Sequence, residues 1–155
     1  MSSPKENPSR TLIRRTSRIH GSGVFAAAPI FRNERLIEYR GERLPPQVAD
    51  ARHLHFDHES AHTFLFSVNV EITIDATLTG NMARWINHSC GPNCEAVEDD
   101  GRIFIESRKP IAPGEEITYD YAFILDERHT ASAKRRYQCI CGSNGCRGTM
   151  LARKR

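Results

Sequence analysis

The chain has 155 residues, a formal net charge of +3 and a sequence pI near 8.7, with 39% hydrophobic and 26% charged residues. A domain of this size buries roughly two-thirds of its unfolded surface, so it does not need disulfides to fold. The net charge is too small to make a strong case for nucleic-acid binding. The sequence also shows no apolar signal-peptide core and no window near the ~18 apolar residues of a membrane span. We expect a soluble protein that stays inside the cell.

In chain order, residues 1–10 are rich in Ser, Pro and charge and predict a flexible leader. Short β-type runs separated by Gly, Pro and Asp turns then predict eight strands. These strands are expected at 11–15, 24–26, 35–39, 63–68, 71–75, 94–97, 102–107 and 116–119. Helical spacing predicts three short helices, at 45–55, 81–86 and 132–137. The pattern indicates one mostly β domain with small helical inserts.

Charge is unevenly distributed along the chain. Basic residues gather in the first twenty residues and in the C-terminal tail, whereas acidic residues dominate between 95 and 127. A solvated surface of mixed charge explains such a pattern. The alternative is an acidic face that attracts a basic substrate segment.

Five cysteines in a chain of this kind favour a metal, catalysis or core packing over disulfides. Cys139, Cys141 and Cys146 form a C-x-C-x4-C motif whose glycines let the backbone fold back. A structural zinc ion needs four ligands, so a fourth must come from elsewhere. Cys90 and Cys94 are the remaining candidates.

Four histidines suggest a second, weaker possibility of a metal site. They are His53, His55, His58 and His62. No acid or cysteine completes a familiar ligand set, so an exposed polar connector is the expected structure.

Several motifs follow one another in a specific order. They read H-G-S-G-V-F at 20–25, I-E-Y-x-G-E at 37–42, I-D-A at 74–76, R-W-I-N-H-S-C-x-P-N at 84–93 and G-E-E-I-T-Y-D-Y at 114–121, before the cysteine motif. In this order, over residues 11–151, the chain resembles the SET-domain protein-lysine methyltransferases with a post-SET zinc motif.

The resemblance implies a SET-type β-clip of short curved sheets with a knot-like crossing, where the Asn-His and Tyr-x-Tyr segments meet. Residues 11–125 would form the SET domain and residues 126–155 the zinc-binding tail. The resemblance also implies S-adenosylmethionine as methyl donor and Zn²⁺ as structural metal. Cys90 would be the fourth zinc ligand, which leaves Cys94 free.

The resemblance further assigns a set of residues to the cofactor. They are His20, Gly21, Ser22, Gly23, Phe64, Asn87, His88 and Ile140. Phe64 stands where the family often has an aromatic hydroxyl. No aromatic follows Cys146, so Met150 or Leu151 is expected to cover the adenine.

Methyl transfer from a sulfonium is an in-line displacement that needs positioning and a neutral amine. Tyr121 is the expected catalytic hydroxyl, and Tyr119 lies two residues earlier on the same face of an extended segment. A hydroxyl at Tyr119 crowds the amine, so we predict mainly monomethylation. In isolation a Tyr-x-Tyr strand is more often simple packing.

The expected substrate is a basic protein, such as a histone or nucleoid protein tail. A catalytically inactive peptide-binding module and a nucleic-acid-binding zinc element are the alternatives. The sequence predicts no oligomeric state. The expected location is the cytoplasm if the protein is bacterial, and otherwise chromatin in a nucleus.

Overall fold

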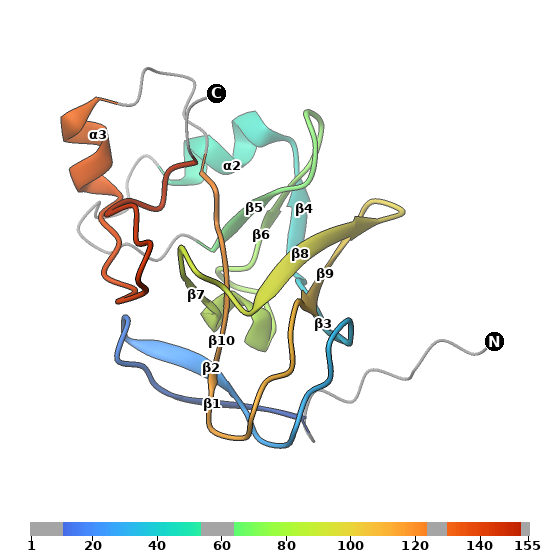
Figure 1. Cartoon of the computed structure of the whole chain (residues 1–155). Helices are drawn as coiled ribbons and strands as arrows, with labels where there is room; N and C mark the ends of the chain where they lie inside the picture. The colour runs from blue at the N-terminus through green and yellow to red at the C-terminus, as the bar shows by residue number, and fades with distance from the viewer. Residues whose placement is uncertain (1–10, 54–63, 124–129, 153–155) are drawn as a thin grey trace.

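A computed structural model describes residues 11–53, 64–123 and 130–152, and consists mainly of short strands (Figure 1). The strands are β1 (Leu12–Thr16), β2 (Ser22–Ala26), β3 (Arg35–Glu38), β4 (Glu42–Leu44), β5 (Leu65–Ser67), β6 (Thr73–Asp75), β7 (Asn87–His88), β8 (Cys94–Asp99), β9 (Arg102–Ser107) and β10 (Glu116–Tyr119). The helices are α2 (Pro46–His53), the 3₁₀ helix η1 (Met82–Trp85) and α3 (Ala131–Arg136).

The mostly β prediction is confirmed, and each of the eight predicted strands is present with ends shifted by a few residues. β4 and β7 were not predicted, because two or three residues are too few to show an alternating pattern. The three predicted helices are also present, although the second is a single 3₁₀ turn. The predicted leader and His55, His58 and His62 lie outside the described residues.

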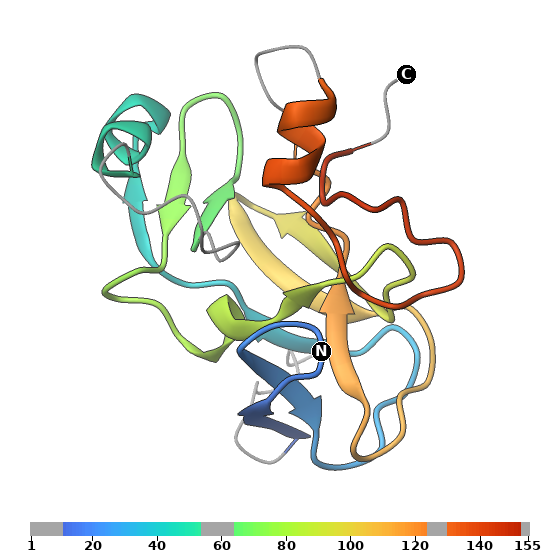
Figure 2. The same cartoon turned by 90° about the vertical axis from the view of Figure 1, so that its left-hand side faces the viewer.

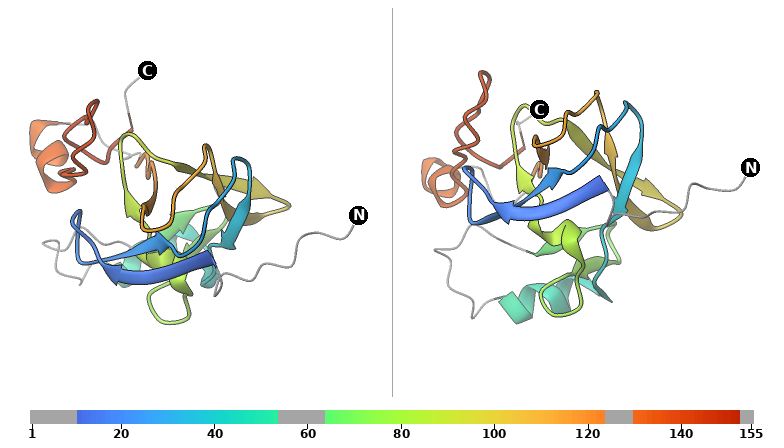
Figure 3. Two further views of the ribbon diagram at one scale, coloured as in Figure 1. Left: turned by 60° about the horizontal axis from the view of Figure 1, so that its bottom comes forward. Right: turned by 90° about the horizontal axis from the view of Figure 1, so that it is seen from below.

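The strands form three small sheets, in the orders β1-β2-β10-β7, β3-β9-β8 and β4-β6-β5. The views in Figures 2 and 3 show the sheets packed around a common centre, with β1 as the open edge of the first sheet. The core lies between the sheets and includes the fully buried Val24, Ile105 and Ile117. None of the helices in these residues is long and apolar enough to cross a membrane.

β10 occupies the centre of the first sheet and brings distant motifs together. It pairs antiparallel with β2, where Ile117 lies opposite Val24. On its other side it pairs parallel with β7, where Tyr119 lies opposite His88. The predicted meeting of the Asn-His and Tyr-x-Tyr segments is therefore confirmed.

The buried side chain of Asn93 fixes the position of β10. Its Nδ2 donates to the backbone oxygen of Glu116 at 2.8 Å, and its Oδ1 accepts from the backbone N–H of Thr118 at 2.9 Å. The two bonds satisfy backbone groups on the side of β10 that does not face β2. Asn93 thus takes the place of a neighbouring strand along this part of β10.

We expect Asn93→Ala to lower the free energy of unfolding by about 2–4 kcal/mol, because it leaves a buried N–H and a buried C=O without partners. Denaturant unfolding measures the change. The control is Asn69→Ala at an exposed turn, where Oδ1 accepts from the N–H groups of Glu71 and Ile72. Equal losses in the two variants would contradict this view of Asn93.

Candidate functional site

A hollow of about 250 Å³ lies where the β1–β2 turn, β7, the end of β10 and the C-terminal segment meet. It is lined by Ile19, His20, Asn87, His88, Tyr121, Arg135, Arg136, Gln138, Cys139, Ile140 and Met150. The structure therefore brings together five residues that the sequence assigned to the cofactor and to catalysis. These are His20, Asn87, His88, Ile140 and Tyr121.

The glycines of the β1–β2 turn shape the approach to the hollow, although Gly21, Ser22 and Gly23 do not line it. Gly21 has a φ of 43°, which favours glycine. A Cβ on Gly23 would lie 2.2 Å from Oε1 of Glu116. The hydroxyl of Ser22 accepts a hydrogen bond from the guanidinium of Arg14 at 3.1 Å, so it belongs to the hairpin.

The amide of Asn87 holds this turn in place. Its Nδ2 lies 3.1 Å from the carbonyl oxygen of His20, 3.0 Å from that of Ser22 and 2.9 Å from Oε1 of Glu116. The side-chain donor of Asn87 is thus used within the protein. Any polar contact that Asn87 makes to a cofactor must come from its other polar groups.

His88 connects β10 to the cysteine motif. Its Nδ1 accepts the backbone N–H of Tyr121 at 3.0 Å, so in the neutral ring Nε2 carries the hydrogen. That Nε2 lies 3.3 Å from Sγ of Cys90. Burial lowers the pKa of His88 to about 4 in spite of the nearby Asp120 carboxylate, so the ring is neutral at physiological pH.

Tyr121 and Tyr119 lie side by side, with ring centroids 4.9 Å apart. The hydroxyl of Tyr121 donates to the carbonyl oxygen of Ile86. Within the described residues, the hydroxyl of Tyr119 has no hydrogen-bond partner. Burial raises the pKa of both phenols well above the usual value, so both stay protonated.

Phe64 does not line the hollow. Its ring packs against Trp85 at 5.2 Å in an edge-on arrangement, close to the guanidinium of Arg84. Phe66, which the sequence did not single out, packs near Tyr119, and the two ring centroids are 6.2 Å apart. The two phenylalanines thus belong to a group of packed aromatic rings next to the tyrosines, outside the hollow.

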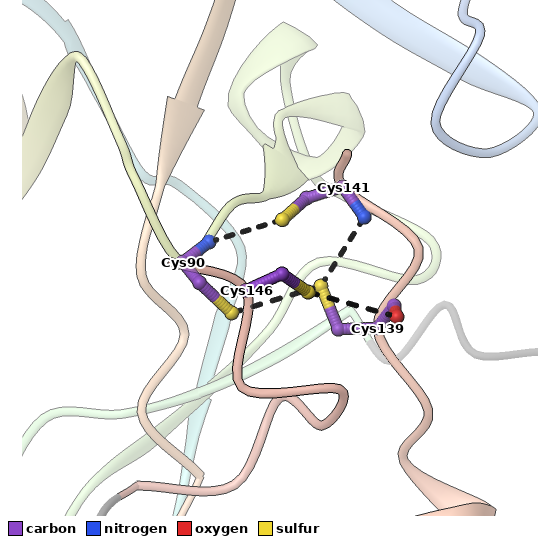
Figure 4. Close-up of side chains that lie close together, drawn as sticks. All are labelled: Cys90, Cys139, Cys141 and Cys146. Atoms are coloured by element: carbon purple, nitrogen blue, oxygen red, sulfur yellow. Dashed lines mark hydrogen bonds between the residues drawn. The ribbon is translucent and has the colours of Figure 1, made fainter. Parts of the chain in front are cut away.

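Four cysteine side chains converge from two distant segments (Figure 4). The sulfurs of Cys90, Cys139, Cys141 and Cys146 all lie within 4.8 Å of one another. The Sγ atoms of Cys90 and Cys139 are 3.8 Å apart. This distance matches the separation of two sulfur ligands in a tetrahedral site with Zn–S bonds of about 2.3 Å. The cluster therefore suits a tetrahedral soft metal ion such as zinc.

Backbone N–H groups surround the four sulfurs, as expected for thiolate ligands. Those of Cys141, Arg147 and Gly148 each lie 3.4 Å from a cysteine sulfur. Cys94 is fully buried elsewhere, and burial raises the pKa of its thiol to about 12. In the described part of the chain, the four cysteines are the one cluster of metal-type ligands, and the side chain of His53 lies outside that part.

Two residues missed by the sequence reasoning tie the cysteine segment to the tyrosine segment. The guanidinium of Arg147 makes a two-bond ion pair with Asp120, at 2.8 and 2.9 Å. Asp120 lies between Tyr119 and Tyr121, so this ion pair holds the C-terminal segment against the segment that contains the two tyrosines. A charged residue beside each motif was the only sequence signal.

The hollow also contains residues that were not predicted. Arg135 and Arg136 of α3 and Gln138 form one side of it. Met150 lines it, whereas Leu151 is only 1% exposed and does not. Of the two side chains that the sequence suggested as covers for an adenine, only Met150 borders the hollow.

The sequence of residues 21–122 matches the SET domain family. The chain belongs to the SET-domain family. This agrees with the joined Asn87-His88 and Tyr119–Tyr121 segments and with the cysteine cluster beside them.

Among curated SET-domain proteins, histone-lysine N-methyltransferase SETD1 of Drosophila melanogaster is 44% identical over 139 residues, or 86% of this chain. Human histone-lysine N-methyltransferases SETD1A and SETD1B are each 42% identical over the same length. The chain covers only 7–8% of the length of these relatives. The similarity therefore concerns the SET region of much longer proteins.

We expect Cys90→Ser to lose bound zinc, because it removes the ligand that joins the tail to the Asn-His segment. Metal analysis of the purified protein measures zinc per chain. Cys94→Ala is the matched control and keeps its zinc. Equal zinc contents in the wild type and Cys90→Ser would contradict the four-cysteine site.

Proposed function

We propose that the chain transfers a methyl group from S-adenosylmethionine to the side-chain amine of a lysine in a basic protein, mainly giving monomethyl-lysine. The observation that carries the proposal is the position of Tyr121. Its neutral phenol lies in the same hollow as Asn87 and His88, and is fixed at both its hydroxyl and its backbone N–H. The substrate part of the proposal is supported by the similar proteins of fly and human, which are named histone-lysine N-methyltransferases.

When bound, S-adenosylmethionine supplies an electrophilic methyl group on a sulfonium. The protein must orient a neutral amine toward that methyl group and keep water out. Tyr121 can do this as a fixed hydrogen-bonding group, since its raised pKa prevents it from becoming a phenolate. The positive sulfonium would lower the pKa of the lysine ammonium group, whose proton would pass to solvent water, so no ionised tyrosine is needed.

The proposed cofactor residues are His20, Gly21, Ser22, Gly23, Phe64, Asn87, His88 and Ile140. The hollow supports His20, Asn87, His88 and Ile140 directly. The Gly21–Gly23 turn acts through its backbone, because Asn87 binds the carbonyls of His20 and Ser22. Phe64 does not line the hollow, and its packing against Trp85 is the contact that supports its part in the proposal.

We further propose that zinc occupies the four-cysteine cluster and that residues 126–155 form a post-SET tail that folds with it. His88 supports this coupling, because one ring nitrogen contacts Cys90 and the other holds Tyr121. Zinc binding would thereby order the wall of the hollow that contains Ile140 and Met150.

The substrate proposed is a histone or a histone-like nucleoid protein, which places the protein at chromatin in a nucleus or in a bacterial cytoplasm. The acidic residues do not border the hollow in the described part of the chain. Glu95, Glu98, Asp99 and Asp100 lie in the β8–β9 hairpin, which points away from α3 (Figure 1). An acidic contact with a basic tail would therefore be made at a distance from the reacting lysine.

We expect Tyr121→Phe to reduce methylation of a histone mixture by at least ~100-fold while binding of S-adenosylhomocysteine is kept, because the change removes only the orienting hydroxyl. Radiolabel transfer and calorimetry measure the two properties. Tyr137→Phe is the control, since Tyr137 packs against Phe123 at 5.7 Å and does not line the hollow. A wild-type protein that binds cofactor and histones but transfers no methyl group would instead support the inactive binding module.

We expect Tyr119→Phe to shift the product from monomethyl-lysine toward di- and trimethyl-lysine. The hydroxyl of Tyr119 lies beside Tyr121 and has no partner among the residues that the structure describes, so removing it makes room for a larger amine. Mass spectrometry of product peptides at equal turnover measures the distribution. An unchanged distribution would refute the product-limiting position of Tyr119.

A further inference from the structure

Positive charge is concentrated on two segments of the structure. Residues 11–33 and 130–152 contain Arg and Lys but no Asp or Glu. Six exposed basic side chains on them form what we call the cationic face: Arg14, Arg15 and Arg18 of the β1–β2 hairpin and Lys134, Arg135 and Arg136 of α3.

The two segments approach each other at the hollow. Ile19 and His20 of the hairpin turn line it from one side, and Arg135 and Arg136 line it from another. Figure 2 shows the hairpin turn and α3 on the side of the molecule that faces the viewer. The cationic face therefore consists of two segments that border the same hollow, although they are more than a hundred residues apart in sequence.

The cationic face is not neutralised by the protein. Within the described residues, none of its six side chains forms an ion pair, whereas Arg35, Arg52 and Arg147 all pair with carboxylates. Arg14 is held in place without a carboxylate. Its guanidinium stacks 3.9 Å from the ring centroid of Trp85 and donates to Ser22.

The β8–β9 hairpin, which contains Glu95, Glu98, Asp99 and Asp100, points away from α3 (Figures 1 and 3). Two carboxylates close to the hollow are engaged within the protein, because Glu116 accepts hydrogen bonds from Ser17 and Asn87 and Asp120 pairs with Arg147. Exposed positive charges without carboxylate partners attract a polyanion, even though the net charge of the chain is only +3. Six such side chains suit a partner with many negative charges better than a single small anion.

We propose that the cationic face binds the phosphodiester backbone of duplex DNA. Five of the six side chains are arginines, whose planar guanidinium groups suit two-bond contacts with phosphate oxygens. Contacts of this kind carry no base preference, so binding is independent of DNA sequence. Binding does not depend on the proposed methyl transfer and can be measured without cofactor.

Fluorescence anisotropy with a labelled DNA duplex of arbitrary sequence, repeated over a range of salt concentrations, tests the proposal on the whole chain. With up to six phosphate contacts, the slope of log affinity against log salt is expected to approach about −5. Arg15→Glu/Arg18→Glu is expected to weaken binding by at least ~10-fold and to reduce the slope by about 2. Neither residue lines the hollow.

The matched control is Arg43→Glu/Arg108→Glu, which makes the same charge change outside the cationic face and is expected to alter affinity by less than about twofold. Equal weakening by the two double variants would overturn the proposal, because it would reflect net charge alone. Binding of poly-glutamate as tight as binding of DNA would also overturn it, as would a slope shallower than about −1. Zinc content and circular dichroism verify that each variant is folded.

Discussion

The parallel pairing of β7 with β10 is the contact on which the site depends. It places Asn87 opposite Thr118 and His88 opposite Tyr119, across about thirty residues of sequence. Three further bonds follow from this register: Ser89 N–H to the Tyr119 carbonyl, Tyr121 N–H to His88, and the Tyr121 hydroxyl to Ile86. A shift of one residue would turn these side chains to the opposite face and separate all three pairs.

The cysteine cluster extends the same pairing into the C-terminal segment. Cys90 follows β7 by two residues, so its sulfur can meet Cys139, Cys141 and Cys146 only when β7 is in register. Arg147 then reaches Asp120, which lies between the two tyrosines. A metal ion at the cluster would therefore be coupled to the conformation of the tyrosine segment by two short connections. One is the chain from β7 to Cys90, and the other is the ion pair of Arg147, next to Cys146, with Asp120.

The β1–β2 hairpin contributes residues both to the hollow and to the cationic face. The β1–β2 turn is shaped by glycines and held by Asn87, which presents His20 to the hollow. The same hairpin carries Arg14, Arg15 and Arg18 on its exposed surface. Asn87 and His88 at the hollow are buried and neutral, whereas the arginines of the hairpin remain in solvent, where their charge costs little free energy.

The sequence by itself determined the family, the mostly β architecture and the identity of the chemical groups. Motifs such as Asn87-His88 and Tyr119–Tyr121 are local, and strands of alternating residues such as β9 are visible in single short windows. The family resemblance favours Cys90 over Cys94 as the fourth ligand, and in the structure Cys90 lies with the other three sulfurs whereas Cys94 is buried elsewhere.

Only the tertiary structure decided which of these groups meet. β4 and β7 form because partner strands supply their hydrogen bonds, and the local sequence pattern does not predict them. The pairing of Arg147 with Asp120 and the meeting of the hairpin with α3 join residues far apart in the chain, whose contact depends on the packing of all three sheets. Composition records a net charge of +3, but only the fold brings the basic side chains of the β1–β2 hairpin and of α3 to the same hollow, because the distribution of charge depends on positions in space.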